Sequence, residues 1–293
     1  MRTDKISLGT VQFGIDYGIN SISGQVKSSE VFDILNYAQQ CGINLLDTAP
    51  AYGNSEQVLG ASNIQNFQIV TKTRHFSQAK ISDKDITILT NDLNKSLQLL
   101  KKKSVYGVLV HNENDLLKPG AEKIIRQLEL FKKQGLISKI GVSIYNYDQL
   151  EIILNNFKID LVQLPFNILD RRLIDNGIFR ELINKDVEIH ARSIFLQGLL
   201  LMDLQNKATK FDRWKVLWKI WHEWLNDNQI TALEATIRYA TSIPEISRVL
   251  VGVDTKNQLE EIIIASDGFL PDIPPELYID DVNLLNPSNW DKL

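Results

Sequence analysis

The amino-acid sequence predicts an α/β protein folded as a single (β/α)8 barrel (a TIM barrel), with an insertion after the seventh strand and an extended C-terminal tail. Three observations predict this class. Eight short apolar segments alternate with eight segments of helical periodicity. Most of the apolar segments lack strict alternation with polar residues, which is typical of parallel strands buried on both faces. A length of 293 residues suits a closed barrel of eight such units.

Each predicted strand is a short apolar run that ends near residues typical of turns. We expect strands over Ile6–Thr10, Ile43–Leu46, Phe67–Lys72, Val105–His111, Ile137–Ser143, Ile159–Leu164, Val187–Arg192 and Ser247–Gly252. Several of the helical segments begin with a capping side chain, such as Ser28 or Ser29 in the first and Asp83 in the third. We expect helices over Ser29–Gln40, Ser55–Ala61, Ser82–Leu100, Pro119–Gln134, Tyr147–Asn155, Asp170–Lys185, Thr231–Ala240 and Thr255–Ala265.

The main competing fold is a doubly wound open sheet. Such a sheet usually has a glycine-rich G-x-G-x-x-G turn after its first strand. Here that turn reads LGTVQFG over Leu8–Gly14, which does not fit the pattern. Because no linker or low-complexity tract divides the chain, we expect one domain over 1–293, with a core of about residues 5–266 and a tail over 267–293. The proline-rich tail could fold over one mouth of the barrel.

The predicted insertion, over Leu199–Asn228, carries an aromatic stripe. Trp214, Trp218, Trp221 and Leu225 recur at helical spacing. The stripe could form an aromatic wall over a ligand pocket. A helix packed on the barrel is the more common origin of such a pattern, and we favour it.

Composition excludes several classes of protein. A formal net charge of −4 argues against a nucleic-acid or anionic-membrane partner. The single Cys41 excludes a disulfide framework and a cysteine-based zinc cluster, and no other metal ligand set is apparent. No apolar run approaches the roughly 20 residues that span a bilayer, and the N-terminal sequence lacks the apolar core of a signal peptide. We therefore expect a cytoplasmic protein.

Polar side chains end five consecutive predicted strands. They are Asp47, Lys72, His111, Ser143 and Gln163, and Tyr52 follows Asp47 in the next loop. Each one alone has an ordinary explanation, such as a turn, a solvated surface or a structural histidine. Barrel active sites, however, lie where strands end and βα loops begin. The convergence therefore predicts a site at that mouth.

Four of these residues together would form a proton donor for carbonyl reduction. The hydroxyl of Tyr52 would be the acid, and a neighbouring Lys72 ammonium would lower its pKa by stabilising phenolate. Asp47 would supply the counter-charge that a buried lysine needs. His111 would hydrogen-bond the substrate oxygen. A cofactor would supply the hydride, because no side chain can.

These residues carry a resemblance to the aldo-keto reductases, which extends over nearly the whole chain. The segment LLDTAPAYGNSEQVLG, over Leu45–Gly60, is similar to the family's most recognisable motif. The resemblance implies a catalytic tetrad of Asp47, Tyr52, Lys72 and His111, with Tyr52 as general acid. The segments GVSIYN and LVQLPFN resemble family segments whose polar residues contact the nicotinamide carboxamide. The resemblance gives that role to Ser143 and Gln163.

The same resemblance implies that NADP or NAD lies extended across the barrel mouth, without a Rossmann turn. The loops after the seventh and eighth strands would hold the nucleotide, through Arg192, Ser193, Gly198, Gly252, Asp254, Thr255 and Gln258.

The chain departs from the family pattern in both of these loops. Arg192 stands where the family often has an aromatic residue stacked on the nicotinamide. Its guanidinium could stack there, bind pyrophosphate or an anionic substrate, or pair with an acid. Gln258 and Ile262 replace the Arg and Asn usually offered to the 2′-phosphate of NADP. Asp254 could favour the free 2′-hydroxyl of NAD or simply cap a helix. Both cofactors are therefore open, and the family resemblance slightly favours NADPH.

The sequence says little about the identity of the substrate. Tyr17, Asn112 and Phe166 could line the pocket, and Arg74 could add a polar contact. The polar rim suggests a small polar aldehyde, ketone or sugar. The alternatives are a nucleotide-binding sensor with little turnover and, less favoured, a Schiff-base aldolase that uses Lys72. We expect a small-molecule carbonyl partner and a monomer or small homo-oligomer.

Overall fold

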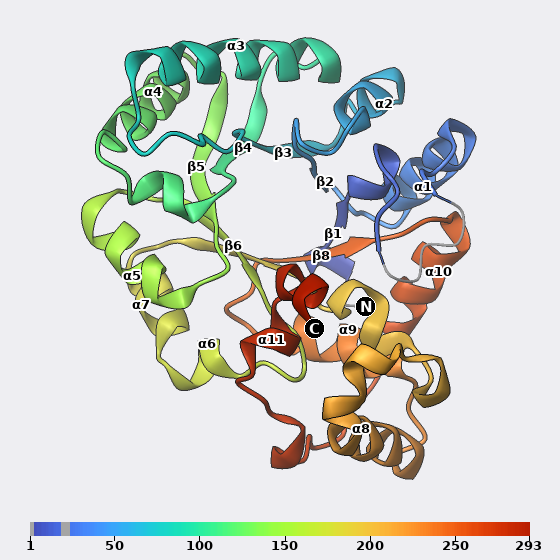
Figure 1. The fold of residues 1–293 in the computed structure, drawn as a ribbon. Helices are drawn as coiled ribbons and strands as arrows, with labels where there is room; N and C mark the ends of the chain where they lie inside the picture. The colour runs from blue at the N-terminus through green and yellow to red at the C-terminus, as the bar shows by residue number, and fades with distance from the viewer. Residues whose placement is uncertain (1–2, 19–23) are drawn as a thin grey trace.

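A computed structural model describes residues 3–18 and 24–293. Eight parallel strands close into a barrel in the order β1 to β8, and Figure 1 shows the ring of strands with the helices outside it. The strands are β1 (Ile6–Gly9), β2 (Leu45–Asp47), β3 (Gln68–Lys72), β4 (Val105–Val110), β5 (Ile137–Ser143), β6 (Leu161–Pro165), β7 (Glu188–Arg192) and β8 (Arg248–Gly252). The predicted fold class is therefore confirmed.

The barrel has two apolar layers. A small cluster from five strands packs together and is separate from the main core; it consists of Leu45, Val70, Leu109, Leu161 and Leu250. A much larger cluster lies between the strands and the surrounding helices. The interior is thus a packed core rather than a channel, as expected of eight-stranded barrels.

The helices follow the predicted alternation. They are α1 (Ser28–Gln40), α2 (Ser55–Ala61), α3 (Asp83–Leu100), α4 (Glu122–Lys133), α5 (Tyr147–Asn156), α6 (Arg172–Asp175), α7 (Ile178–Asn184), α8 (Lys215–Asp227), α9 (Ala232–Ser242), α10 (Lys256–Ala265) and α11 (Val282–Leu285). The single helix predicted over Asp170–Lys185 is wrong, because the chain breaks at Gly177, whose φ of 72° is not helical. In the described ranges, no helix is long and apolar enough to cross a membrane.

The insertion after β7 packs through its tryptophans. Trp218 and Trp221 of α8 are fully buried, and their indole N–H groups donate to the carbonyls of Phe211 and Leu200 at 3.1 and 3.2 Å. The stripe is therefore buried core, as the favoured interpretation expects, and its hydrogen bonds run to other residues of the insertion. The tryptophans are not among the residues that line the cleft described below.

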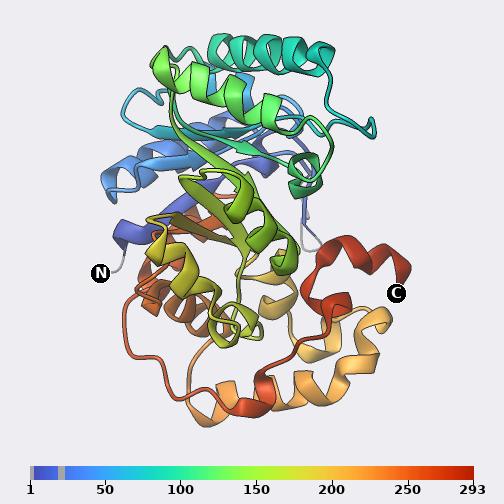
Figure 2. The same ribbon diagram turned by 90° about the vertical axis from the view of Figure 1, so that its left-hand side faces the viewer.

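The C-terminal tail runs past α8 and ends beside the barrel mouth (Figure 2). The Ile279 amide donates to the carbonyl of Leu169, and the ring of Trp290 packs edge-on against Phe211 at 5.0 Å. The tail therefore packs against the loop after β6 and the insertion. Among the described residues, none of the tail lines the cleft.

Candidate active site

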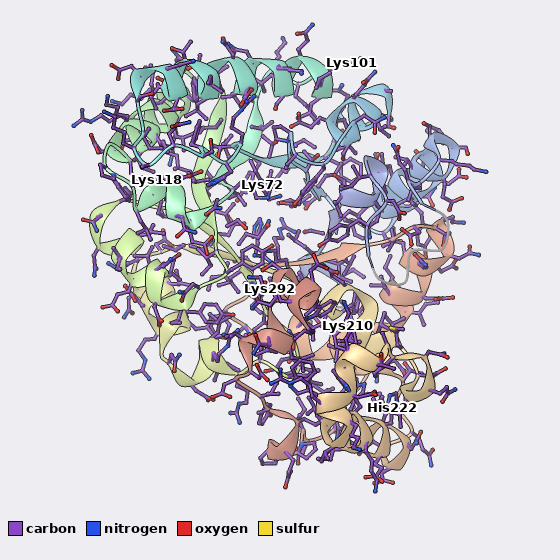
Figure 3. The ribbon with its side chains drawn as sticks, in the orientation of Figure 1. Lys72, Lys101, Lys118, Lys210, His222 and Lys292 are labelled. Carbon is purple, nitrogen blue, oxygen red and sulfur yellow. The ribbon has the colours of Figure 1, made fainter. Side chains whose placement is uncertain are left out.

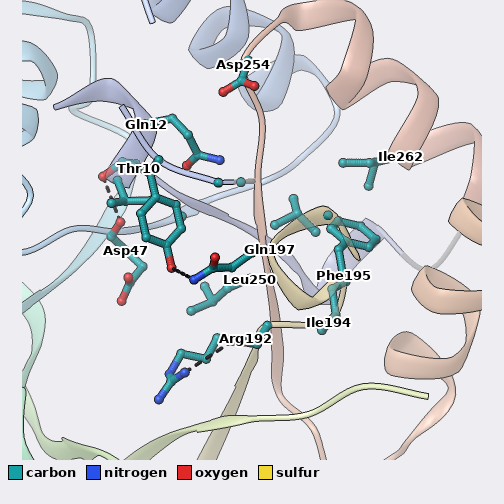
Figure 4. A pocket seen from close by; sticks show the side chains of 18 of the residues that line it. Thr10, Gln12, Asp47, Arg192, Ile194, Phe195, Gln197, Leu250, Asp254 and Ile262 are labelled. Atoms are coloured by element: carbon teal, nitrogen blue, oxygen red, sulfur yellow. Dashed lines mark hydrogen bonds between the residues drawn. The ribbon is translucent and has the colours of Figure 1, made fainter. Parts of the chain in front are cut away.

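A cleft of about 400 Å³ opens at the carboxyl ends of the strands. Its walls come from several strand ends and from the loops after β1, β2, β7 and β8. In Figure 4, Arg192 lies at one end of the cleft and Asp254 at the other, with Asp47 at the side. A cavity of this size at this mouth is where barrel enzymes place their chemistry.

A buried ion pair adjoins the site, and of its two residues Asp47 lines the cleft. Lys72 ends β3 and Asp47 ends β2, and the Lys72 Nζ donates to the Asp47 Oδ2 at 2.6 Å and to the Thr48 carbonyl at 3.0 Å. Lys72 lies inside the ring of strands, whereas Lys101 and His222 lie in the outer layer (Figure 3). Burial alone would lower the pKa of Lys72, but the charge of Asp47, together with the neighbouring Tyr52, outweighs burial and raises that pKa. Lys72 is therefore a firmly held ammonium.

The turn that carries Tyr52 is fixed against the loop after β1. A Cβ on Gly14 would come within 1.7 Å of the Tyr52 carbonyl, and one on Gly53 within 2.4 Å of the Gly14 carbonyl. The two backbones can approach this closely only because both residues are glycine. The Ser55 hydroxyl also donates to the Thr10 carbonyl at 2.8 Å. The two sequence motifs around Thr10 and Tyr52 therefore meet as one structural unit.

Tyr52 faces both Lys72 and His111. The Lys72 Nζ is 4.7 Å from the centre of the Tyr52 ring, and the His111 ring lies edge-on to it at 6.0 Å. Burial raises the pKa of Tyr52, and Lys72 lowers it by less. The expectation of a lowered pKa is therefore wrong in net direction, because desolvation outweighs the ammonium. The phenol is protonated at neutral pH, as an acid must be.

His111 is neutral in the folded protein. Burial, and next the charge of Lys72, lower its pKa to about 4. An uncharged imidazole can donate a hydrogen bond to a carbonyl oxygen while leaving proton transfer to a stronger partner.

We expect His111 to make the fold acid-sensitive. Its pKa is about 4 when folded and 6.5 when unperturbed, so between these values the unfolded chain binds a proton that the folded chain resists. Stability therefore falls as pH drops through this range. Thermal unfolding is measured near neutral pH and at about pH 5. The loss of stability between the two pH values should be smaller for His111→Gln than for the parent protein. Equal losses in the two proteins would contradict this assignment.

Ser143 and Gln163 stand opposite each other at the ends of β5 and β6, and both line the cleft. The Gln163 Nε2 donates to the Asp47 Oδ1 at 2.7 Å. Asp47 thus accepts from Lys72 through one oxygen and from Gln163 through the other, which links the predicted cofactor side of the cleft to the ion pair.

Arg192 ends β7 and reaches back toward β5. Its guanidinium lies 3.9 Å from the centre of the Tyr145 ring and donates to the Ile144 carbonyl at 2.8 Å. In the part of the chain that the structure describes, no carboxylate forms an ion pair with it. Pairing with a nearby acid, one of the alternatives for this residue, is therefore excluded within those ranges.

The residues of the cleft fit a dinucleotide. In the loop after β7, Ser193, Leu196, Gln197 and Gly198 all have positive φ, a conformation typical of backbone concavities that bind phosphate. Ser193, Gln197 and Gly198 line the cleft. The Gln12 Oε1 is buried with no hydrogen-bond partner among the described residues, and it lies on the cleft wall against Gly252. A buried oxygen of this kind suits a bound ligand that donates a hydrogen bond to it.

The loop after β8 shows which residue caps α10. The Thr255 side chain accepts from the Gln258 N–H and so caps α10, and Thr255 lies outside the cleft-lining set. Asp254 does not cap the helix. It lines the cleft, and its Oδ1 is buried with no hydrogen-bond partner in the described ranges.

Two predicted substrate residues lie elsewhere. Phe166 is fully buried and stacks on Tyr239 of α9, so it belongs to the outer core. The Asn112 side chain accepts from the Asn114 N–H and caps a short 3-10 helix, away from the cleft lining. Both predictions are wrong.

Of the two other residues considered for the substrate, Tyr17 lines the cleft and Arg74 does not. The Tyr17 hydroxyl accepts from the Gln197 Nε2 at 3.2 Å. Arg74 is exposed, paired with Asp92 and outside the cleft lining.

Sequence reasoning missed several residues of the cleft wall. Gln12, Tyr145 and Gln197 all line it. A signal existed for Gln12, because it follows the first strand within the LGTVQFG motif. Tyr145 and Gln197 lie in irregular loops, where spacing does not tell which side chain points inward.

The fold and the cleft together define a class of protein, a (β/α)8 barrel with a paired lysine, a half-buried tyrosine and a neutral histidine at the strand ends. A family model described as the aldo/keto reductase family matches residues 5–272. The chain belongs to this family and is an NAD(P)-dependent oxidoreductase.

Known relatives agree with this family. The chain is 27% identical over 218 residues to the NADH-specific methylglyoxal reductase of Escherichia coli, a match that covers 67% of the chain and 65% of that enzyme. It is 24% identical over 286 residues to an uncharacterized oxidoreductase of Bacillus subtilis, covering 90% and 91% of the two chains. An aldo-keto reductase of Bacillus halodurans, solved in its holo form, shares the fold with a TM-score of 0.72 at 20% identity, covering 92% of this chain and 88% of that one.

Proposed function

We propose that this protein reduces the carbonyl group of a small polar aldehyde, ketone or sugar by hydride transfer from NADH, with Tyr52 as the general acid. One observation carries the proposal: at the barrel mouth, the Lys72 Nζ lies 4.7 Å from the centre of the Tyr52 ring, and the centre of the His111 ring lies 6.0 Å from it. The oxidoreductase family of the chain supports the same reaction class.

The side chains divide the work of the reaction. When bound, the nicotinamide cofactor supplies the hydride to the carbonyl carbon. The Tyr52 Oη gives its proton to the carbonyl oxygen, and the His111 imidazole orients that oxygen through a hydrogen bond. The Lys72 ammonium stabilises the tyrosinate left behind, and Asp47 holds Lys72 in place. The tyrosinate regains its proton from solvent after the product leaves.

The competing aldolase mechanism is disfavoured by the state of Lys72. A Schiff-base lysine must lose its proton to attack a carbonyl, which requires a lowered pKa. Here burial is outweighed by Asp47 and Tyr52, and the pKa of Lys72 is raised.

The proposal is tested by following the loss of NADH absorbance with a panel of small aldehydes, ketones and aldoses. We expect substrate-dependent oxidation of NADH that yields the matching alcohol. An absence of turnover across the panel, together with tight binding of NADH, would instead favour a nucleotide sensor.

We predict that NADH binds at least about tenfold more tightly than NADPH. The Asp254 carboxylate lines the cleft, and its Oδ1 has no hydrogen-bond partner among the described residues, which suits a ribose hydroxyl, whereas its charge repels a 2′-phosphate. The Lys256 ammonium lies 5.2 Å above the Tyr37 ring, outside the cleft lining. Fluorescence titration of both cofactors measures the ratio. The NADH specificity of the methylglyoxal reductase relative supports the same preference.

Substitution of Asp254 tests the origin of this preference. Asp254→Asn should narrow the difference between the two affinities, and Asp254→Arg should reverse it. Glu260→Gln serves as the matched control, because Glu260 lies on the following helix but outside the cleft lining. A preference that is unchanged in both Asp254 variants would show that another residue sets it.

A further inference from the structure

We propose that Arg192 is a substrate-specificity residue that binds a carboxylate, so that the preferred substrates are aldehydes or ketones that also carry an acid group. This inference rests on the proposed carbonyl reduction at the same site. It adds a second anchor point to the cleft, next to the groups that handle the carbonyl oxygen.

The guanidinium is held in a fixed orientation with donors to spare. It is stacked 3.9 Å from the centre of the Tyr145 ring, and one N–H donates to the Ile144 carbonyl at 2.8 Å. A second N–H makes a long contact of 3.4 Å to the Ser193 hydroxyl. Since a guanidinium has five N–H donors, others stay available to a ligand in the cleft. An arginine that is stacked and pinned in this way has little conformational freedom left to lose on binding.

Among the described residues, the charge of Arg192 has no counter-charge at the end of the cleft where the chemistry takes place. Lys72 and Asp47 neutralise each other through their 2.6 Å contact, and His111 is neutral because burial lowers its pKa to about 4. In the described residues, no carboxylate pairs with Arg192. Figure 4 shows Asp254, a carboxylate of the cleft wall, at the far end. The reaction end of the cleft is therefore cationic and the opposite end acidic.

Arg192 lies in the same cavity as the groups that hold the carbonyl oxygen. It lines the cleft with Tyr52 and His111. Burial is the main cause of the pKa shifts of these two residues, and Arg192 adds a smaller lowering at both, so its charge is felt at the reacting centre. One molecule can thus present its carbonyl to Tyr52 and its acid group to Arg192.

A planar carboxylate matches the chemistry of this anchor. Guanidinium and carboxylate form two parallel charge-assisted hydrogen bonds, which fix both distance and orientation. Such a contact would align the carbonyl carbon before hydride arrives and would discriminate against neutral carbonyl compounds of the same size.

The test compares acids with matched neutral amides. With NADH, kcat/KM is measured for 3- and 4-carboxybenzaldehyde and for the corresponding carbamoylbenzaldehydes, which have nearly the same shape without the charge. We expect a clear preference for at least one acid over its amide. The ratio of kcat/KM for the acid to kcat/KM for its amide should fall by about 10- to 100-fold in Arg192→Gln, mainly because KM for the acid rises. Arg192→Lys should retain part of this preference.

A binding measurement separates recognition from turnover. Calorimetry with the carboxybenzyl alcohols, which cannot be reduced further, should show binding to the parent protein that weakens by about tenfold or more in Arg192→Gln. The matched control is Arg171→Gln, which removes another guanidinium stacked on a tyrosine, Tyr278 at 4.1 Å, outside the cleft lining. Arg171→Gln should leave both the ratio and the binding unchanged.

The possible outcomes distinguish this inference from the proposed function. If no aldehyde of either charge is reduced, the proposed carbonyl reduction fails. If acid and amide react equally well, or fall together in Arg192→Gln, the carboxylate anchor is overturned while carbonyl reduction stands. A loss in Arg192→Gln that appears only as weaker NADH binding also overturns it, because Arg192 would then serve the cofactor. A preference for D-glyceraldehyde 3-phosphate over D-glyceraldehyde, without a preference for carboxylates over amides, would also overturn the carboxylate anchor.

Discussion

Replacing Tyr52 by phenylalanine is expected to lower kcat/KM for carbonyl reduction by about 10²- to 10⁴-fold, the range that a positioned general acid contributes. The change deletes one hydroxyl and keeps the ring that packs beside Lys72 and His111. Burial raises the pKa of Tyr52, so the parent protein carries the proton throughout the neutral range. Its rate of reduction should therefore vary little with pH there. The rate of alcohol oxidation, which requires the tyrosinate, should rise with pH.

The measurement needs two controls to isolate proton donation. Titration of NADH fluorescence should give the same affinity for Tyr52→Phe and the parent protein. Tyr37→Phe, a substitution on α1 outside the cleft lining, should retain full activity. A Tyr52→Phe protein that reduces aldehydes at the parent rate would remove Tyr52 from its proposed role and leave the source of the proton unassigned.

The alternation of strands and helices was readable from the sequence, because each unit needs its own apolar run and its own helical period. The polar strand ends were readable for a related reason. Parallel strands deliver all their carboxyl ends to one mouth, so Asp47, Lys72 and Gln163 converge once the barrel closes. The 2.6 and 2.7 Å contacts that join them through Asp47 are the outcome of that geometry.

The errors at the site have equally specific causes. Side chains of a strand alternate between its two faces, so Phe166, three positions after the inward-facing Gln163, falls on the opposite face and joins the outer core. Counting positions would have shown this. The wall formed by Gln197 could not be found in the same way, because its φ of 52° is unusual for a non-glycine residue and follows no periodic rule.

The net pKa of Tyr52 illustrates a further limit of sequence reasoning. The sequence shows that a lysine stands nearby, and from this a lowered pKa follows. The burial of Tyr52, which raises its pKa by more than Lys72 lowers it, is a property of the folded chain and is not encoded in the spacing of the two residues.

Removal of the Lys72 ammonium should damage both stability and chemistry. Lys72→Met leaves the Asp47 carboxylate buried and without its cation, which is expected to cost about 3–5 kcal/mol in the free energy of unfolding. Both side chains of the pair are at most 5% exposed, so solvent cannot replace the lost partner. Urea unfolding measures the loss. Activity should fall as well, because the tyrosinate of Tyr52 loses its neighbouring positive charge.

A double variant separates these two effects. In Lys72→Met with Asp47→Asn the uncompensated charge is gone, so much of the stability should return while reduction stays slow. The control is Lys118→Met, which breaks the pair with the buried Asp115 at 2.7 Å outside the cleft lining and should lower stability without changing kcat. If activity recovers in step with stability in the double variant, Lys72 serves only to hold the fold together, and the stabilisation of tyrosinate must come from elsewhere in the cleft.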